Sequence, residues 1–171
     1  MATNSTVTIK QPMWQTVVLF SLGFWLSACL LLDLVILPSM YAAGMMKAAG
    51  FASAGYLLFG MFNRIELLCA ALVLTGILTV VKRHQLNPKW TIPAIILSVI
   101  LLLVALIDTY SLTPQMSALA MQLNLFEPVQ GIPSGMTQMQ QGYWMLELFK
   151  LGSSGILLSW MYRNQQQRLA S

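Results

Sequence analysis

Charged side chains lie inside the apolar stretches of this chain, where they could bind a cation or carry a proton. The chain of 171 residues has only five acidic residues. An ionised side chain at the centre of a bilayer costs about 3 kcal/mol on insertion scales, so charges retained there usually pair with one another or serve a function. The candidate cation or polar site consists of Asp33, Arg64, Glu66, Asp108, Glu147 and Lys150.

The spacing of these residues predicts some of their pairing. Glu147 and Lys150 are three residues apart, so they share one face of a helix and can form an ion pair. Arg64 and Glu66 are two apart and point to nearly opposite sides. Arg64 therefore needs an acid from another helix or a route along which its side chain reaches the membrane surface. Four acids against two bases leave a formal excess of two negative charges, so the site must bind a cation, hold protons or be open to water.

The elements that position these residues are predicted to be membrane-spanning helices. The sequence is 57% hydrophobic and only 8% charged, which is typical of a single integral membrane domain covering residues 1–171. A hydrocarbon core about 30 Å thick is crossed by roughly 20 helical residues. We therefore expect an all-α fold, a bundle of four transmembrane helices, with spans near 15–37, 55–81, 91–111 and 142–162. No internal repeat is evident.

The basic residues outside the spans predict the orientation of the bundle. Cytoplasmic loops carry an excess of Lys and Arg. Only Lys47 falls on one side, whereas the other side receives Lys10, Lys82, Arg83, Lys89, Arg163 and Arg168. Both termini of this multi-pass protein are therefore expected on the cytoplasmic side of its membrane, and the sequence does not indicate which membrane that is. The six charges within the spans then lie in its outer half, with one acid on each helix, and predict an acidic layer near the outer face.

The connection between the third and fourth predicted spans, 112–141, is expected to face outward. It is long for a connection within a bundle, and long connections often carry function. Thr113 and Pro114 suit the start of a helix. The apolar residues that follow at helical spacing predict a short amphipathic helix near 114–126 on the outer surface. Such a segment could also contact another membrane protein.

Methionines form a second unusual feature near the outer side. Thioether sulfurs are soft ligands that suit copper, so a copper ion is the cofactor that these residues would favour. The alternative is that methionine fills irregular apolar gaps and adaptable surfaces. The methionines closest together in sequence, and so the speculative metal ligands, are Met45, Met46, Met136 and Met139.

Other chemistries find less support in the sequence. His84 is the only histidine, so a bis-histidine haem or a histidine-based zinc site cannot form within one chain. Cys29 and Cys69 both lie within predicted spans and outside any paired motif, and we interpret them as small buried hydrophobic residues. No nucleophile with a matching base is visible, so we do not expect an enzyme.

Three segments carry a resemblance to known membrane proteins. In order along the chain they are GFWLSACLLLDLVILPSMY, AGFASAGYLLFGMFNRIE and TYSLTPQM. This order resembles a family of four-helix membrane proteins of unknown function, related to TMEM-type and copper-resistance-D (CopD)-type proteins. The resemblance implies a compact four-span bundle and a link to metal handling. The chain lacks the outward-facing histidines of a copper importer.

Two functional hypotheses follow from the sequence. The first is a small membrane protein that handles a cation, a proton or a metal such as copper, through the acidic layer. The second is a non-catalytic accessory subunit or assembly factor of a larger membrane complex, with segment 112–141 as its contact. A purely structural role, in which ion pairs fix the helix register, is the alternative to both. The expected surroundings are the lipid bilayer and either a homo-oligomer or a larger complex, without nucleic acid, because the basic residues lie between apolar stretches.

Overall fold

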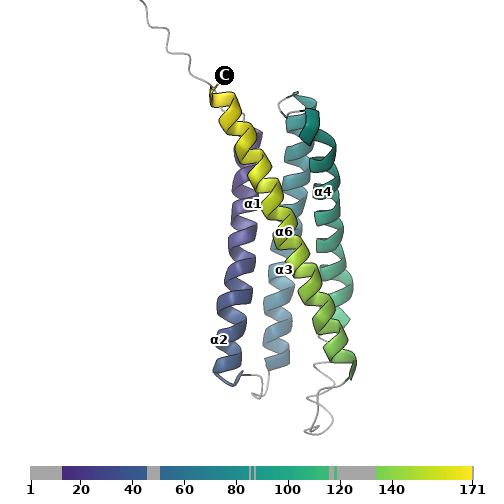
Figure 1. Ribbon diagram of the computed structural model, residues 1–171. Coiled ribbons are helices and arrows are strands. Elements are labelled where there is room, and N and C mark those ends of the chain that lie inside the picture. Colours follow the sequence, from purple (N-terminus) through teal and green to yellow (C-terminus); the bar gives the residue numbers. More distant parts are fainter. Residues whose placement is uncertain are drawn as a thin grey trace, which may run out of the picture.

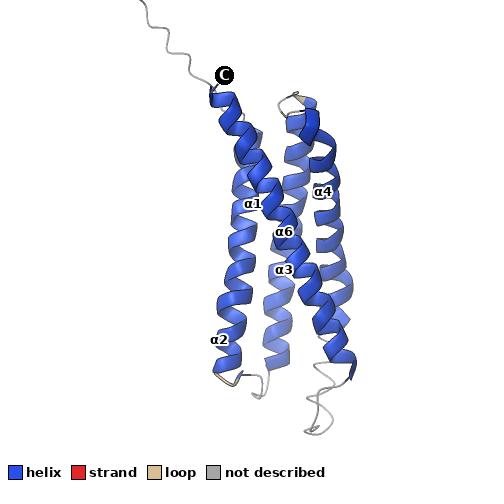
Figure 2. Ribbon diagram, in the orientation of Figure 1, coloured by secondary structure: helices blue, strands red, loops and turns tan. Residues whose placement is uncertain are grey.

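The computed structural model describes residues 13–45, 51–84, 86, 88–115, 118 and 134–170. Within these residues the secondary structure is helical, with short turns and no strand (Figure 2). The elements are α1 (Met13–Leu31), the π-helical η1 (Leu32–Ile36), α2 (Leu37–Ala42), α3 (Phe51–Lys82), α4 (Pro88–Ile107), the π-helical η3 (Asp108–Leu112) and α6 (Ser134–Ala170).

The four long helices form a bundle in which neighbours run antiparallel (Figure 1). Both α3 and α6 contact α1 and α4, so the order around the bundle is α1, α3, α4, α6. α6 runs obliquely across the other helices (Figure 1). Each of the four helices therefore has one face toward a common interior.

Three of the helices are long and apolar enough to cross a membrane, namely Met13–Ala42, Ser53–Lys82 and Pro88–Gln115. The first three predicted spans lie within them. The fourth, 142–162, lies within α6, which is less apolar because it carries Glu147, Lys150 and several serines. The predicted all-helical fold, compatible with a multi-pass membrane protein, is confirmed. Four crossings and cytoplasmic termini stay predictions.

Large apolar side chains cover the outside of the bundle, while its interior holds polar groups as well as an apolar core. The buried apolar core includes Val18, Leu22, Val73, Ile77, Leu101 and Leu157. The exposed side chains include Phe20, Leu57, Ile92, Leu103 and Leu148. A helix bundle with an apolar exterior and buried charges is the pattern expected of protein surrounded by lipid.

α1 ends in a π-helical turn, η1, just before Pro38. The backbone N–H of Leu37 donates to the Leu32 carbonyl, five residues back instead of four. A proline has no N–H, and its ring crowds the carbonyl four residues before it, so a regular α-helix is unfavourable there. Asp33 lies on this widened turn, where it is buried.

The same irregularity recurs at the end of α4. The N–H of Thr113 donates to the Asp108 carbonyl across η3, and Pro114 follows. Thr113 has helical backbone angles of −61° and −46°, and 113–115 continue the helix. Thr113 therefore does not begin a new helix, because the π-helical turn accommodates Pro114 without a break. The predicted amphipathic helix near 114–126 otherwise lies outside the described residues, apart from residue 118.

The close approach of α1 and α3 depends on a glycine. A Cβ atom on Gly76 would overlap Cγ2 of Val18 and lie 3.8 Å from the Trp14 carbonyl oxygen. In contrast, a Cβ on Gly152 in α6 would meet nothing within 4 Å. Small residues at such contacts let membrane helices pack closely.

These two glycines predict opposite effects of the same substitution. Gly76→Ala should lower the stability by about 1–3 kcal/mol, because the added methyl group overpacks the α1–α3 contact. Gly152→Ala should raise it by up to about 1 kcal/mol, because alanine favours a helix over glycine. Unfolding temperatures of both variants in the same detergent measure the difference. A Gly76→Ala variant as stable as Gly152→Ala would contradict the close packing.

Candidate functional site

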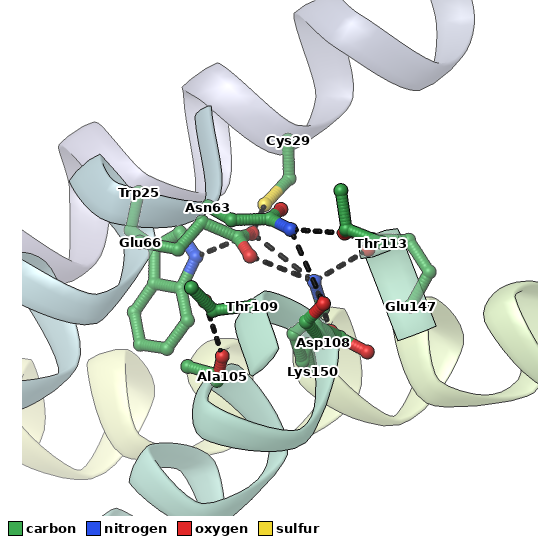
Figure 3. A network of polar contacts seen from close by, with 10 residues as sticks. All are labelled: Trp25, Cys29, Asn63, Glu66, Ala105, Asp108, Thr109, Thr113, Glu147 and Lys150. Carbon is green, nitrogen blue, oxygen red and sulfur yellow. Dashed lines mark hydrogen bonds and ion pairs between the residues drawn. The ribbon is translucent and has the colours of Figure 1, made fainter. Parts of the chain in front are cut away.

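The ammonium group of Lys150 lies at the centre of a buried polar cluster (Figure 3). Its Nζ atom is 2.9 Å from Oε2 of Glu66 and 3.1 Å from Oε1 of the same residue. It is also 3.0 Å from Oδ2 of Asp108 and 2.7 Å from Oε2 of Glu147. One positive charge thus holds carboxyl groups from α3, η3 and α6 together, and the structure contains the Glu147–Lys150 pair expected from the spacing.

Glu66 is the most completely bonded acid of the cluster. Its Oε1 atom accepts hydrogen bonds from Nε1 of Trp25 at 3.0 Å and from the thiol of Cys29 at 3.1 Å, in addition to that from Lys150. Each of these neighbours donates, and an ionised carboxylate is purely an acceptor. The surroundings of Glu66 therefore suit its ionised form.

Other carboxyl oxygens in the cluster are buried without such donors. Asp33 is only 4% exposed, and although a hydroxyl and a carboxyl group lie beside it, neither of its oxygens forms a hydrogen bond of regular geometry with the described residues. The same holds for Oδ1 of Asp108 and Oε1 of Glu147. The Asp33 side chain lies beside Glu147 and Tyr143. A buried carboxyl oxygen without a donor is unfavourable, so a proton or a cation would be bound most favourably at these atoms.

An amide group connects the cluster to the π-helical turn of η3. The Nδ2 atom of Asn63 donates to the main-chain carbonyl of Asp108 at 3.4 Å and to Oγ1 of Thr113 at 2.5 Å (Figure 3). Asn63 is buried on the same face of α3 as Glu66, three residues away, as its spacing predicts. It ties α3 to the turn that carries Asp108.

The structure does not bring Arg64 into this cluster. Its side chain is exposed, whereas Glu66 two residues later is buried, in line with the opposite directions expected from their spacing. Among the described residues, the interior therefore holds four carboxyl groups, those of Asp33, Glu66, Asp108 and Glu147, and one basic group, that of Lys150. The formal excess of negative charge inside the bundle is three, not the two obtained when Arg64 is included.

Of the four candidate methionine ligands, the structure describes the side chain of Met45. Met45 is 45% exposed. Met46 lies outside the described residues, and Met136 and Met139 belong to α6 but their side chains are not among those described. Binding of copper by these methionines therefore stays a prediction.

Sequence reasoning missed the contribution of α1 other than Asp33. Cys29 is buried as expected, but its thiol donates to Glu66 instead of packing only as an apolar group. The spacing contained a signal, since Trp25, Cys29 and Asp33 follow one another at four-residue steps and so share a helix face. Tyr143, four residues before Glu147, shows the same signal on α6.

Replacement of the central ammonium tests the packing of the cluster. Lys150→Met should lower the stability by about 3–5 kcal/mol, because it leaves buried carboxylates without their counter-charge. Arg64→Met makes the same change of charge at an exposed position and should alter the stability by less than about 0.5 kcal/mol. Equal loss of stability in the two variants, measured by thermal unfolding in one detergent, would contradict a buried Lys150.

Comparison of the chain with protein-family models, curated proteins and solved structures gave no match. The resemblance to TMEM-type and CopD-type proteins therefore stays a prediction, carried by the three sequence segments alone.

Proposed function

We propose that this is a cation-handling membrane protein whose buried cluster takes up and releases protons. The observation that carries the proposal is the ratio of charges in the interior. Four buried carboxyl groups face a single ammonium group, which leaves a formal charge of −3 if every acid is ionised. A charge of this size is very unfavourable in a low-dielectric interior, so protons or other cations must offset it.

The contacts assign different roles to the four acids. Glu66 is surrounded by donors and forms the ionised partner of Lys150. Asp33, Asp108 and Glu147 retain oxygens without donors, and these are the groups that would carry protons. Asp33 and Glu147 are neighbours, and two carboxyl groups at one site favour a state in which they share a proton.

The two π-helical turns support a role of the cluster in the uptake and release of protons, in addition to a role in packing. Asp33 lies on η1 and Asp108 begins η3. π-helical turns are rare and occur frequently at functional sites, because they interrupt the regular hydrogen bonds of the helix. Both acids therefore sit where the helix can change its local bonding most easily.

α6 supports a fourth crossing of the membrane. Its inward face carries Glu147 and Lys150, whereas Leu148, Phe149 and Ile156 are exposed. Apolar residues outside and charges inside suit a helix in lipid. Its 37 residues would extend about 55 Å, enough to span a bilayer. With four spans, the excess of basic residues places both termini in the cytoplasm and the cluster closer to the outer face.

The accessory or assembly role depends on segment 112–141. Most of its residues between 116 and 133 lie outside the described part of the chain. That role, and assembly into a homo-oligomer or a larger complex, therefore stay predictions.

Proton movement through reconstituted protein tests the proposal. The full chain in liposomes containing a trapped pH indicator should show proton flux above that of protein-free liposomes when a membrane potential is imposed. Asp33→Asn and Asp108→Asn should reduce the flux to the protein-free value, because each removes a proton-carrying group. Glu127→Gln is the matched control, since Glu127 is the one acid outside the four predicted spans, and it should retain the flux.

Infrared difference spectra of the same samples provide a second readout. A change of pH should alter the carbonyl band of protonated carboxyl groups, and Asp33→Asn or Asp108→Asn should remove part of this change. The proposal is wrong if the unsubstituted protein shows neither flux nor a carboxyl band that these substitutions reduce.

A further inference from the structure

We propose that Cys29, Glu66 and Glu147 form a binding site for a divalent cation of the zinc or cadmium type. One ligand atom from each residue, the sulfur of Cys29 and a carboxylate oxygen of each glutamate, lies within 4.8 Å of the others, and all three residues are buried. A tetrahedral ion with bonds of about 2.3 Å to sulfur and about 2.1 Å to oxygen holds these atoms about 3.6 Å apart. Cys29 Sγ and Glu66 Oε1 are already 3.1 Å apart.

A second observation, the bonding of the Glu147 carboxyl group, also favours a cation at this place. Glu147 points into the cluster (Figure 3), and its Oε1 atom has no hydrogen-bond partner in the described part of the chain. Glu147 is only 2% exposed. Asp33 lies beside it with both oxygens in the same condition. Asp33 does not belong to the three-ligand set, but the free Oε1 atom of Glu147 is one that a bound cation would contact.

Lys150 offers a way to exchange one positive charge for another. Its ammonium now contacts both glutamates, but it also contacts Oδ2 of Asp108 at 3.0 Å, and Asp108 does not belong to the three-ligand set. When a metal ion binds Glu66 and Glu147, the flexible lysine side chain can keep its pair with Asp108. Lys150 would thus act as the resident counter-ion of the site without metal.

The binding step is balanced in charge and protons. The S–H bond of Cys29 breaks, a sulfur–metal bond forms, and the proton is released to the solution, since a thiolate is the form that ligates metals. The divalent ion adds two positive charges and the thiol gives up one. The formal excess of negative charge in the cluster therefore falls by one.

The ligand types determine the class of cation. Ca²⁺ needs six to eight oxygen ligands and Mg²⁺ prefers an octahedron of oxygens. One sulfur and two carboxylates in a small buried site, with water as the fourth ligand, suit a four-coordinate zinc-type ion instead. The site contains no methionine, so it is distinct from the methionine-based copper hypothesis. It uses the cluster of the proposed function but does not depend on proton flux.

Titration of the purified full chain with Cd²⁺ tests this site. The protein in detergent should retain about one Cd²⁺ per chain after desalting and develop the ultraviolet charge-transfer absorption of a sulfur–cadmium bond, because one thiolate ligates the ion. Cys29→Ser should remove the absorption. Cys69→Ser should leave it unchanged, because Cys69 is equally a buried free thiol but does not belong to the ligand set.

A carboxyl variant and a competing ion complete the experiment. Glu147→Gln should weaken Cd²⁺ binding by more than about tenfold, since loss of a group that only holds a metal ligand in place already costs roughly 10- to 100-fold in affinity. Excess Ca²⁺ should not displace Cd²⁺. Absence of the absorption in the unsubstituted protein, or its persistence in Cys29→Ser, would overturn the site. Either result leaves the proton-flux measurement unaffected, so the two proposals can fail separately.

Discussion

Lys150 makes the contacts on which the arrangement of the bundle interior depends. Its ammonium bonds to Glu66 on α3, Asp108 on η3 and Glu147 on its own helix. In water such ion pairs contribute little, but in a low-dielectric interior both the attraction and the cost of losing a partner are large. In a membrane, the apolar side chains on the outside of the bundle would face lipid and distinguish poorly between helix arrangements. The position of one positive charge can therefore select the orientation of three helices.

The two prolines that follow the π-helical turns at the ends of α1 and α4 contribute in a different way. Each removes a backbone donor, and the helix responds by widening into a π-helical turn that carries an aspartate. At η3 the Asp108 carbonyl accepts a further hydrogen bond from Asn63, so the irregular turn is held from the neighbouring helix. Backbone irregularity at membrane depth is tolerated where protein groups satisfy it. The π-helical turns therefore position the acids, and in return the polar groups of the interior supply hydrogen bonds to the irregular backbone.

Much of this arrangement could be predicted from sequence because it follows from periodicity. Apolar length predicted the helices, and the spacing of Glu147 and Lys150 predicted their contact. The spacing of Arg64 and Glu66 predicted opposite directions, yet Arg64 was still counted with the site, because sequence does not show which of two opposite faces is inward. The thiol of Cys29 was missed since its partner, Glu66, lies 37 residues away. The π-helical turns were also missed, because a proline near a predicted helix end is equally typical of a new helix start, as at Thr113.

The order of helices around the bundle shows a relationship between the two halves of the chain. In each half, the first helix ends in a π-helical turn that contains an aspartate and is followed by a proline, and the second helix carries a buried glutamate. α1 and α3 thus carry acids at positions similar to those of the acids in α4 and α6, although the sequence shows no internal repeat. The residue three positions after the glutamate is Cys69 in the first half and Lys150 in the second. If the two halves were identical at this position, the interior would contain either no ammonium group or two. The difference between Cys69 and Lys150 therefore determines the net charge of the interior.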